Sequence, residues 1–388
     1  MTGVYIHIPF CKKACHYCNF HFSTSLQHKS RYITALLHEI EAIETHQPWV
    51  KQHRQVHTIY LGGGTPSLLQ PGELSAVFKT LAAKFDLSAT TEITLEANPD
   101  DITPVNLEAW LAVGINRLSI GIQSFRQQDL EWMNRAHTAQ QAQTCVTMAA
   151  AAGFRHFSLD LIYGQPGLTH EVWLSNLQKA EDLGVNHLSC YALTVEEKTA
   201  LHHFVEKGNR LPPDEAMQAA QFDLLMDWAA QHGWDHYEIS NLCQPGHEAQ
   251  HNSAYWNGQP YVGFGASAHS FDGQLTRTSA IANNALYTNY WLQGMGKPYE
   301  IELLTPLQRL HEQIMTGLRT TGGVAYNALT GELAGTKLTL TTRQKVQQLV
   351  EKYTHAGLLI CTGNRLLLTR SGRFRADGIA ADFFVEEL

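Results

Sequence analysis

Three cysteines lie close together near the start of the chain, in the segment "HIPFCKKACHYCNF". They are Cys11, Cys15 and Cys18, and the whole chain has 7 cysteines. Thiolates are soft ligands that favour zinc or iron–sulfur clusters. Because this clustering is too dense to be incidental, we interpret the segment as a metal-binding loop.

The loop is one ligand short of a tetrahedral site, and two kinds of metal centre fit that pattern. A structural zinc ion normally has four protein ligands, and His16 or His21 could supply the fourth. A [4Fe–4S] cluster held by three thiolates instead leaves one iron open for an exchangeable ligand. We favour the cluster and keep zinc as the alternative.

Further polar residues follow runs of strand-forming residues. They are Cys11, the stretch Gly62–Thr65, Glu96, Gln123 and Asp160. In parallel (β/α) barrels the chemistry sits at the carboxyl ends of the strands. If these runs are successive barrel strands, all five features meet at one face.

The elements that would position these residues alternate in type. Apolar runs such as "VYIHIPF", "HTIYLGGG" and "EITLEANP" read as strands, and "RYITALLHEIEAIE" has helical spacing. A recurring scheme of helix end, glycine and strand follows at Gly114, Gly153 and Gly184, with a looser copy at Gly233. Strands alternating with helices predict a parallel sheet. We therefore expect an α/β fold, a partial (β/α)6 barrel.

The pattern of predicted elements changes from about Thr305. Two helical stretches and a hairpin around Thr362–Asn364 resemble a winged-helix module. We predict a barrel with an extension over residues 1–295 and a small α+β domain over 305–388. The boundary is expected within residues 294–305.

Composition limits the function. The chain has 388 residues and a formal net charge of −8, and we found no basic stripe, so we expect no nucleic-acid partner. An odd cysteine count favours reduced thiols over disulfides. No apolar run reaches the length of a membrane span, and the start lacks a secretory signal, so we expect a cytoplasmic protein.

A family resemblance extends over most of the chain. The C-x3-C-x2-C loop closely resembles the radical S-adenosylmethionine (SAM) superfamily. The order of further motifs over roughly residues 4–272 is similar to the oxygen-independent coproporphyrinogen III oxidase family, and within it to the HemW branch of haem chaperones. These motifs are "LGGGTPS", "LEANPD", "SIGIQSF", "NRAH", "LDLIYGQPG", "HNSAYW" and "GFGASAHSF".

The resemblance implies cofactors and their residues. Cys11, Cys15 and Cys18 would hold a [4Fe–4S] cluster whose open iron binds SAM. The residues expected around SAM are Tyr5, Tyr17, Gly63, Gly64, Thr65, Glu96, Gln123, Arg135 and Asp160. In the oxidase branch, positions matching Gln123, Arg135 and Asp160 contact a second SAM. The alternative is that Arg135 and Asp160 form a structural ion pair at the barrel mouth.

Two departures argue against the family's oxidase reaction. Oxidases carry a fourth cysteine two positions after the third, where this chain has Phe20. They also carry a substantial segment ahead of the loop, whereas ten residues precede Cys11 here. The second hypothesis is therefore an enzyme that oxidises coproporphyrinogen III or carries out another radical reaction on a tetrapyrrole.

The motif "HNSAYW" favours haem handling. A neutral imidazole is a good axial ligand for haem iron, and aromatic neighbours can pack on the porphyrin. We expect His251 to be that ligand, with His247, His269 and Cys243 as nearby alternatives. A structural role for His251 is the competing interpretation.

The leading hypothesis is a haem chaperone that binds a [4Fe–4S] cluster, SAM and haem. Its partners would be haem-acceptor proteins, respiratory enzymes first among them. Where an acceptor is a membrane protein, the contact with it would be transient. If SAM is cleaved, an electron donor is also needed. The sequence identifies no catalytic residue and does not distinguish a monomer from a dimer.

Overall fold

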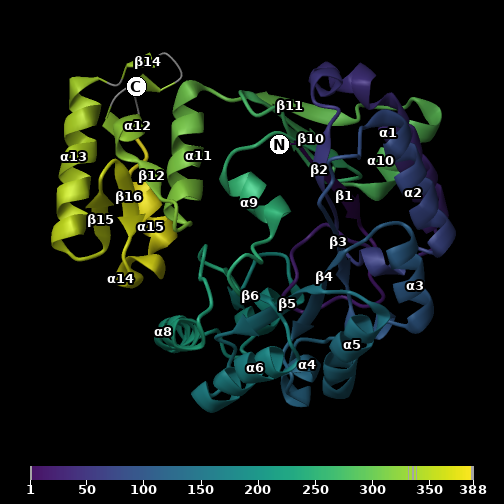
Figure 1. Ribbon diagram of the computed structural model, residues 1–388, viewed down its shortest axis with the longest axis horizontal. Coiled ribbons are helices and arrows are strands. Elements are labelled where there is room, and N and C mark those ends of the chain that lie inside the picture. Colours follow the sequence, from purple (N-terminus) through teal and green to yellow (C-terminus); the bar gives the residue numbers. More distant parts are fainter. Residues whose placement is uncertain (1, 331, 334–335, 338, 386–388) are drawn as a thin grey trace.

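The computed structural model describes residues 2–330, 332–333, 336–337 and 339–385. Six parallel strands form the main sheet, and the helices between them lie on its outer side (Figure 1). The strands are β1 (Thr2–Ile8), β2 (Val56–Gly63), β3 (Glu92–Ala97), β4 (Arg117–Gln123), β5 (His156–Tyr163) and β6 (His187–Ala192). The intervening helices are α1 (Lys29–His46), α2 (Pro71–Lys84), α3 (Pro104–Ala112), α4 (Gln127–Trp132), α5 (Ala139–Ala152) and α6 (His170–Asp182). Short 3-10 helices span Pro48–Gln52, Pro66–Leu68 and Pro99–Asp101.

The predicted partial (β/α)6 barrel is confirmed. The helix before β5 illustrates why these units form: Thr138 and Gln141 make a capping box at its start, and Gly153 ends it with φ 116°. The glycines at the three other repeats also have positive φ. The strands are buried along most of their length, as strands covered on both faces are.

The looser fourth repeat behaves differently from the other three. After Gly233 there are only isolated bridges at Asp235 and Glu238, followed by the short β7 (Asn241–Cys243). This strand runs antiparallel to β6. The parallel sheet therefore ends at β6 and leaves an open side that other elements cover.

An extension lengthens the sheet beyond β1. The full order is β11-β10-β9-β8-β1-β2-β3-β4-β5-β6-β7, which makes 11 strands among the described residues. The added strands are β8 (Tyr261–Phe264), β9 (His269–Phe271), β10 (Thr276–Ala280) and β11 (Tyr299–Leu303). The further helices of this part are α7 (Ala200–Glu206), α8 (Glu215–His232), α9 (Gln250–Trp256) and α10 (Asn284–Gln293). The segment 294–305, predicted as the boundary, thus contains an edge strand of the large sheet.

The C-terminal part has its own hydrophobic core, with Leu310, Ile314 and Leu366 among its buried residues. The predicted hairpin around residues 362–364 is present. The elements are α11 (Pro306–Leu318), β12 (Val324–Ala325), α12 (Tyr326–Thr330), β13 (Glu332–Leu333), β14 (Thr336–Lys337), α13 (Leu340–His355), β15 (Leu359–Thr362), β16 (Arg365–Leu368), α14 (Arg370–Arg373) and α15 (Ala376–Asp382). Residues 386–388 of the predicted domain lie outside the described residues.

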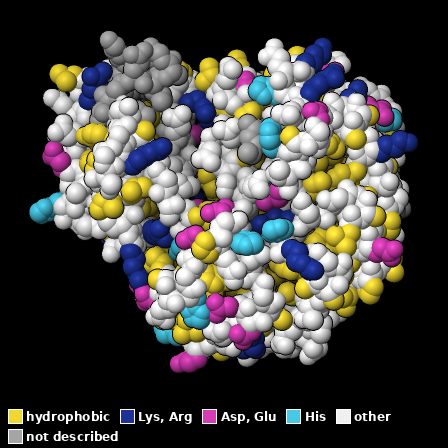
Figure 2. Space-filling view, viewed as in Figure 1, with side chains coloured by type: hydrophobic (Ala, Val, Ile, Leu, Met, Phe, Trp, Pro, Cys, Tyr) yellow, Lys and Arg dark blue, Asp and Glu magenta, His cyan; other side chains and the backbone are white. Residues whose placement is uncertain are grey.

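This C-terminal part docks on the barrel through backbone hydrogen bonds. The amide of Thr321 donates to the carbonyl of Tyr237 at 3.0 Å, and the amide of Ile239 donates to the carbonyl of Arg319 at 3.1 Å. It forms a lobe beside the barrel, and Lys and Arg side chains lie near the junction of the two (Figure 2). The lobe therefore covers part of the open side of the barrel.

Candidate functional site

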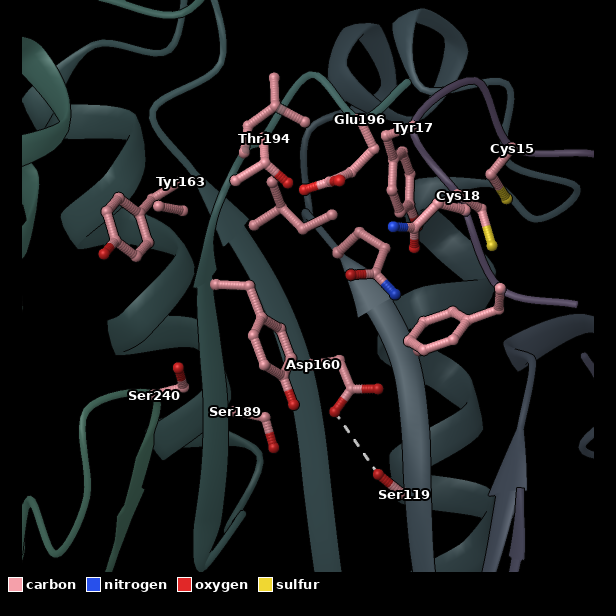
Figure 3. A pocket seen from close by; sticks show the side chains of 18 of the residues that line it. Cys15, Tyr17, Cys18, Ser119, Asp160, Tyr163, Ser189, Thr194, Glu196 and Ser240 are labelled. Atoms are coloured by element: carbon pink, nitrogen blue, oxygen red, sulfur yellow. Dashed lines mark hydrogen bonds between the residues drawn. The ribbon is translucent and has the colours of Figure 1, made fainter. Parts of the chain in front are cut away.

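A cavity of about 670 Å³ lies inside the barrel sheet and reaches the C-terminal lobe. Figure 3 shows Cys15, Tyr17 and Cys18 on one side of it, with Asp160 and Ser189 across from them. The sequence-predicted residues that line it are Cys11, Cys15, Tyr17, Cys18, Gly63, Gly64, Thr65, Glu96, Gln123, Arg135 and Asp160. Tyr5 and His251 are absent from this lining.

The cysteine loop is fixed by contacts with neighbouring loops. Lys12 forms salt bridges with Asp100, at 2.8 Å, and with Asp101. The side-chain amide of Asn134 donates to the carbonyl of Ala14 at 2.7 Å. These contacts tie the loop to the segment after β3 and to the end of α4, and the three free thiols line the cavity.

Two side chains donate hydrogen bonds to the cysteine sulfurs. The hydroxyl of Thr65 lies 3.4 Å from Sγ of Cys11, and Nη1 of Arg135 lies 3.2 Å from Sγ of Cys15. Burial raises the pKa of the Cys11 thiol to about 11. A bound metal centre, which requires thiolates, supplies the positive charge that makes them stable there. The donor set therefore fits an iron–sulfur cluster.

The histidines that could complete a zinc site face elsewhere. Nδ1 of His16 is 3.0 Å from the carbonyl of Trp132, and Nε2 of His21 is 2.8 Å from Oδ1 of Asn284. Neither histidine lines the cavity. Among the described residues, no three His, Cys, Asp or Glu side chains converge on one metal-ion position.

The glycine loop after β2 passes very close to the cysteine loop. A Cβ on Gly64 would lie 2.8 Å from both N and O of Phe10 and 3.0 Å from Sγ of Cys11. Gly63 has φ 112°, which only glycine adopts readily, and its amide donates to Oε2 of Glu96 at 3.0 Å. Here glycine is required by both close approach and backbone conformation.

Glu96 is held at the end of β3 with its carboxylate toward the cavity. Its Oε1 accepts a 2.9 Å hydrogen bond from the hydroxyl of Tyr60. Burial, with the nearby Asp160 carboxylate, raises the pKa of Glu96 to about 7. A carboxylate in this position has lone pairs free to accept further hydrogen bonds from a ligand hydroxyl.

Arg135 and Asp160 do not form the ion pair that was the structural alternative. Nη2 of Arg135 donates to Oδ1 of Asn98 at 2.8 Å and to the carbonyl of Gly121 at 2.5 Å. Asp160 accepts from Ser119 at 3.4 Å (Figure 3). Burial raises the pKa of Asp160 to about 6.

Gln123 and the two tyrosines differ in how they relate to the cavity. Gln123 has φ 70° beside a register shift in β4, and strained non-glycine backbone of this kind clusters at functional sites. The pKa of Tyr17 is raised, mainly by burial. Tyr5 does not line the cavity: its hydroxyl is 3.0 Å from Nδ1 of His7, and its ring stacks on Tyr60, which does line it.

His251 is enclosed by the barrel rather than presented to the cavity. It lies on α9 and is 2 % exposed, and burial lowers its pKa to about 3. Nδ1 is 2.8 Å from the hydroxyl of Thr58, and Nε2 is 2.9 Å from the hydroxyl of Tyr255. Because both ring nitrogens are engaged, His251 is not available as an axial ligand in this structure.

The surroundings of His251 explain its position. The carboxylate of Glu92 accepts hydrogen bonds from the amides of Gln250 and His251, both at 2.9 Å, and so fixes the start of α9 at the amino end of β3. The His251 ring stacks on Tyr60, with centroids 5.2 Å apart. His251 thus supports Tyr60, which in turn holds Glu96.

Sequence reasoning missed the residues that the C-terminal lobe contributes to the cavity. These are Arg319 and the stretch 373–378, "RFRADG". No motif could have linked them to the cysteine loop, because they join it only through docking of the lobe. The two arginines that flank Phe374 were the one local signal available.

The fold and site define a radical SAM protein, and comparison with known proteins agrees. Residues 5–180 match the radical SAM superfamily and residues 304–375 match the HemN C-terminal domain. The radical SAM match implies a [4Fe–4S] cluster and SAM as cofactors. The structure resembles that of the coproporphyrinogen III oxidase HemN from Escherichia coli, with a TM-score of 0.81 and 22% identity, covering 99% of this chain and 90% of that one. At this identity the likeness concerns the fold alone.

Sequence comparison narrows the class. The chain is 34% identical to the heme chaperone HemW of Bacillus subtilis in an alignment 395 positions long, which covers 100% of both chains. It is 34% identical to HemW of Mycobacterium tuberculosis, covering 97% of this chain and 93% of the relative, and 35% identical to HemW of Escherichia coli, covering 71% and 73%. The chain therefore belongs to the HemW family. Among the described residues, no helix combines the length and hydropathy needed to cross a bilayer.

Proposed function

We propose that this protein is a haem chaperone of the radical SAM superfamily, which binds haem and delivers it to acceptor proteins, respiratory enzymes among them. The observation that carries the proposal is the cavity of about 670 Å³ that joins the cysteine loop to the C-terminal lobe. Its volume falls within the range of about 300–1,000 Å³ typical of small-molecule and cofactor sites. Relatives named heme chaperones support this reading.

In this proposal Cys11, Cys15 and Cys18 hold the [4Fe–4S] cluster, and SAM occupies the adjoining part of the cavity. When bound, these two cofactors supply one-electron chemistry. The chain contributes hydrogen bonds to the sulfurs from Thr65 and Arg135.

The glycine loop and Glu96 form the rest of the proposed SAM site. Gly63, Gly64 and Thr65 would bring backbone close to the methionyl end of SAM, and Glu96 would accept hydrogen bonds from its ribose hydroxyls, with Tyr17 nearby. Gln123, Arg135 and Asp160 complete the site or take a second SAM. Arg135 and Asp160 form no ion pair among the described residues, so the Asp160 carboxylate, which accepts from Ser119, keeps further lone pairs for a ligand.

Haem would occupy the side of the cavity walled by the C-terminal lobe. Phe20, which stands where oxidases have a fourth cysteine, lines the cavity and is 68 % exposed, so it offers an apolar surface at the mouth. To reach haem iron, His251 would have to leave its two hydrogen-bond partners, Thr58 and Tyr255. We further propose that the protein acts in the cytoplasm.

Anaerobic reconstitution followed by two assays tests the proposal. Protein loaded with iron, sulfide and SAM should bind haem and transfer it to a haem-free acceptor, measured by the Soret band of the acceptor. Incubation with SAM, a reductant and coproporphyrinogen III should yield no decarboxylated product at a catalytic rate. Turnover without haem transfer would instead support the oxidase hypothesis.

A matched pair of cysteine variants tests the cluster assignment. Cys18→Ser should lose most of the iron and sulfide, whereas Cys361→Ser, at an exposed position outside the cavity, should retain them. Stoichiometric zinc in place of iron and sulfide in the wild type would refute the cluster. Formation of 5′-deoxyadenosine would show that SAM is cleaved, in which case an electron donor is required.

A further inference from the structure

Three arginines of the C-terminal lobe line the barrel cavity. Arg319 follows α11, Arg373 ends α14, and Arg375 precedes α15. They reach the cavity where the lobe docks on the segment just before β7. The lobe therefore adds positive charge to a cavity whose barrel wall carries the acidic residues Glu96 and Asp160.

Two of these arginines lack a partner within the described part of the chain. Arg319 is paired with Asp377 through Nη1 at 2.8 Å. The side chains of Arg373 and Arg375 form neither a salt bridge nor a hydrogen bond with any described residue, the cavity acids included. Burial lowers the pKa of Arg373, yet a guanidinium stays charged in proteins. Its charge is thus uncompensated at a cavity wall.

The chemistry of a matching ligand follows from this arrangement. A guanidinium binds a carboxylate with two parallel hydrogen bonds, so this pair fits a molecule with carboxylates on one edge. Phe374, between the two arginines, is 44 % exposed, and its ring lies 5.9 Å from that of Phe222, which also lines the cavity. An apolar, flat body beside the carboxylates would pack on these rings.

We propose that Arg373 and Arg375 bind the propionate carboxylates of haem, with Phe374 against the macrocycle. This proposal rests on the proposed function and names how the cargo is oriented. With its propionates on the lobe, haem would direct its opposite edge into the barrel. The carboxylate of SAM is the other source of the same chemistry, and the experiment separates the two.

Titration of the reconstituted protein with haem and with haem dimethyl ester tests the assignment. The ester retains iron and macrocycle but lacks both negative charges. The wild type should bind haem about 10- to 100-fold more tightly than the ester, the range expected when charge-assisted hydrogen bonds are lost. The double variant Arg373→Gln/Arg375→Gln should lose that preference, with unchanged affinity for the ester and for SAM.

Two further variants, with the outcomes that would overturn the proposal, keep the test decisive. Arg31→Gln, at an exposed site on α1 whose Nη2 is 3.3 Å from Asn289, is the matched control and should behave as wild type. The conservative Arg373→Lys/Arg375→Lys should restore part of the preference, because charge returns without the bidentate geometry. Equal wild-type affinities for haem and ester, or a double variant that binds both ligands less tightly, would overturn the proposal. A loss of SAM binding alone would assign the arginines to SAM and also overturn it.

The proposed function can fail separately from this assignment. If the wild type bound no haem, coproporphyrin III, which carries four carboxylates, would replace haem as the probe. A loss of its binding in the double variant would keep the carboxylate site while the chaperone function is refuted. Unchanged binding would refute the carboxylate site as well.

Discussion

Replacing His251 by alanine separates two roles for the first residue of the "HNSAYW" motif. As an axial ligand, His251 would contribute to haem binding and little to stability. The structure favours a supporting role, since the buried ring bonds to Thr58 and Tyr255 and stacks on Tyr60. We expect His251→Ala to destabilise the fold and to leave haem affinity nearly unchanged.

The size of the effect follows from the groups left behind. Two hydroxyls lose their partners, and an unsatisfied buried polar group costs about 1–3 kcal/mol. Loss of the buried ring adds a cavity term, which for large-to-small core changes brings the total to about 3–5 kcal/mol. Tyr60 also loses its support, so Glu96 should be held less firmly and SAM affinity should fall.

Urea unfolding measures the stability term, and a haem titration measures the binding term on the same preparations. His203→Ala, an exposed position on α7, is the control and should change neither. Because the alanine variant is destabilised, the titration is done at low temperature, where its folded fraction is checked by circular dichroism. His251→Gln, which retains a donor and an acceptor, should recover part of the stability.

The reasoning would be refuted by the opposite pattern. A folded His251→Ala protein of wild-type stability, with a shifted Soret band and haem affinity reduced by tenfold or more, would establish axial ligation. That result would require α9 to move when haem binds, because neither ring nitrogen is free in the structure.

Three further predictions concern the cluster loop and the core. Gly64→Ala should abolish cluster incorporation, measured as iron and sulfide content, because its Cβ would meet the backbone of Phe10. Gly72→Ala, where a Cβ meets nothing within 4 Å, should retain the cluster, and equal contents would contradict this account. Arg135→Gln should lower the reduction potential of the cluster in a redox titration, because a positive charge and a hydrogen bond to sulfur are lost; an unchanged potential would count against it. Burial raises the pKa of Glu39 from 4.5 to about 7, so the folded state holds a proton that the unfolded state has released, and stability should fall as pH rises between these values. The two pKa values differ by about 2.5, which corresponds to about 3 kcal/mol of unfolding free energy. The unfolding free energy of Glu39→Gln, measured in urea, should lack this part of the decrease with pH.

The sequence by itself determined the barrel fold and which residues lie at the carboxyl ends of its strands. Strand runs, helical spacing and glycines at helix ends are local signals, and parallel strands bring their carboxyl ends to one face. Cys11, Glu96, Gln123 and Asp160 were therefore predicted together from the chain alone, and they do line one cavity. The cysteine loop was equally recognisable, because Cys11, Cys15 and Cys18 all lie within residues 11–18.

Only the tertiary structure shows that the His251 side chain of α9 is buried, and which part of the chain covers the open side of the barrel. The motif containing His251 does not indicate which of its side chains are buried, and that depends on Glu92, Thr58 and Tyr60, far away in sequence. The arginines beside Phe374 reach the cavity only because the C-terminal lobe docks on the barrel. Side-chain direction and docking depend on long-range packing, which a local pattern does not encode.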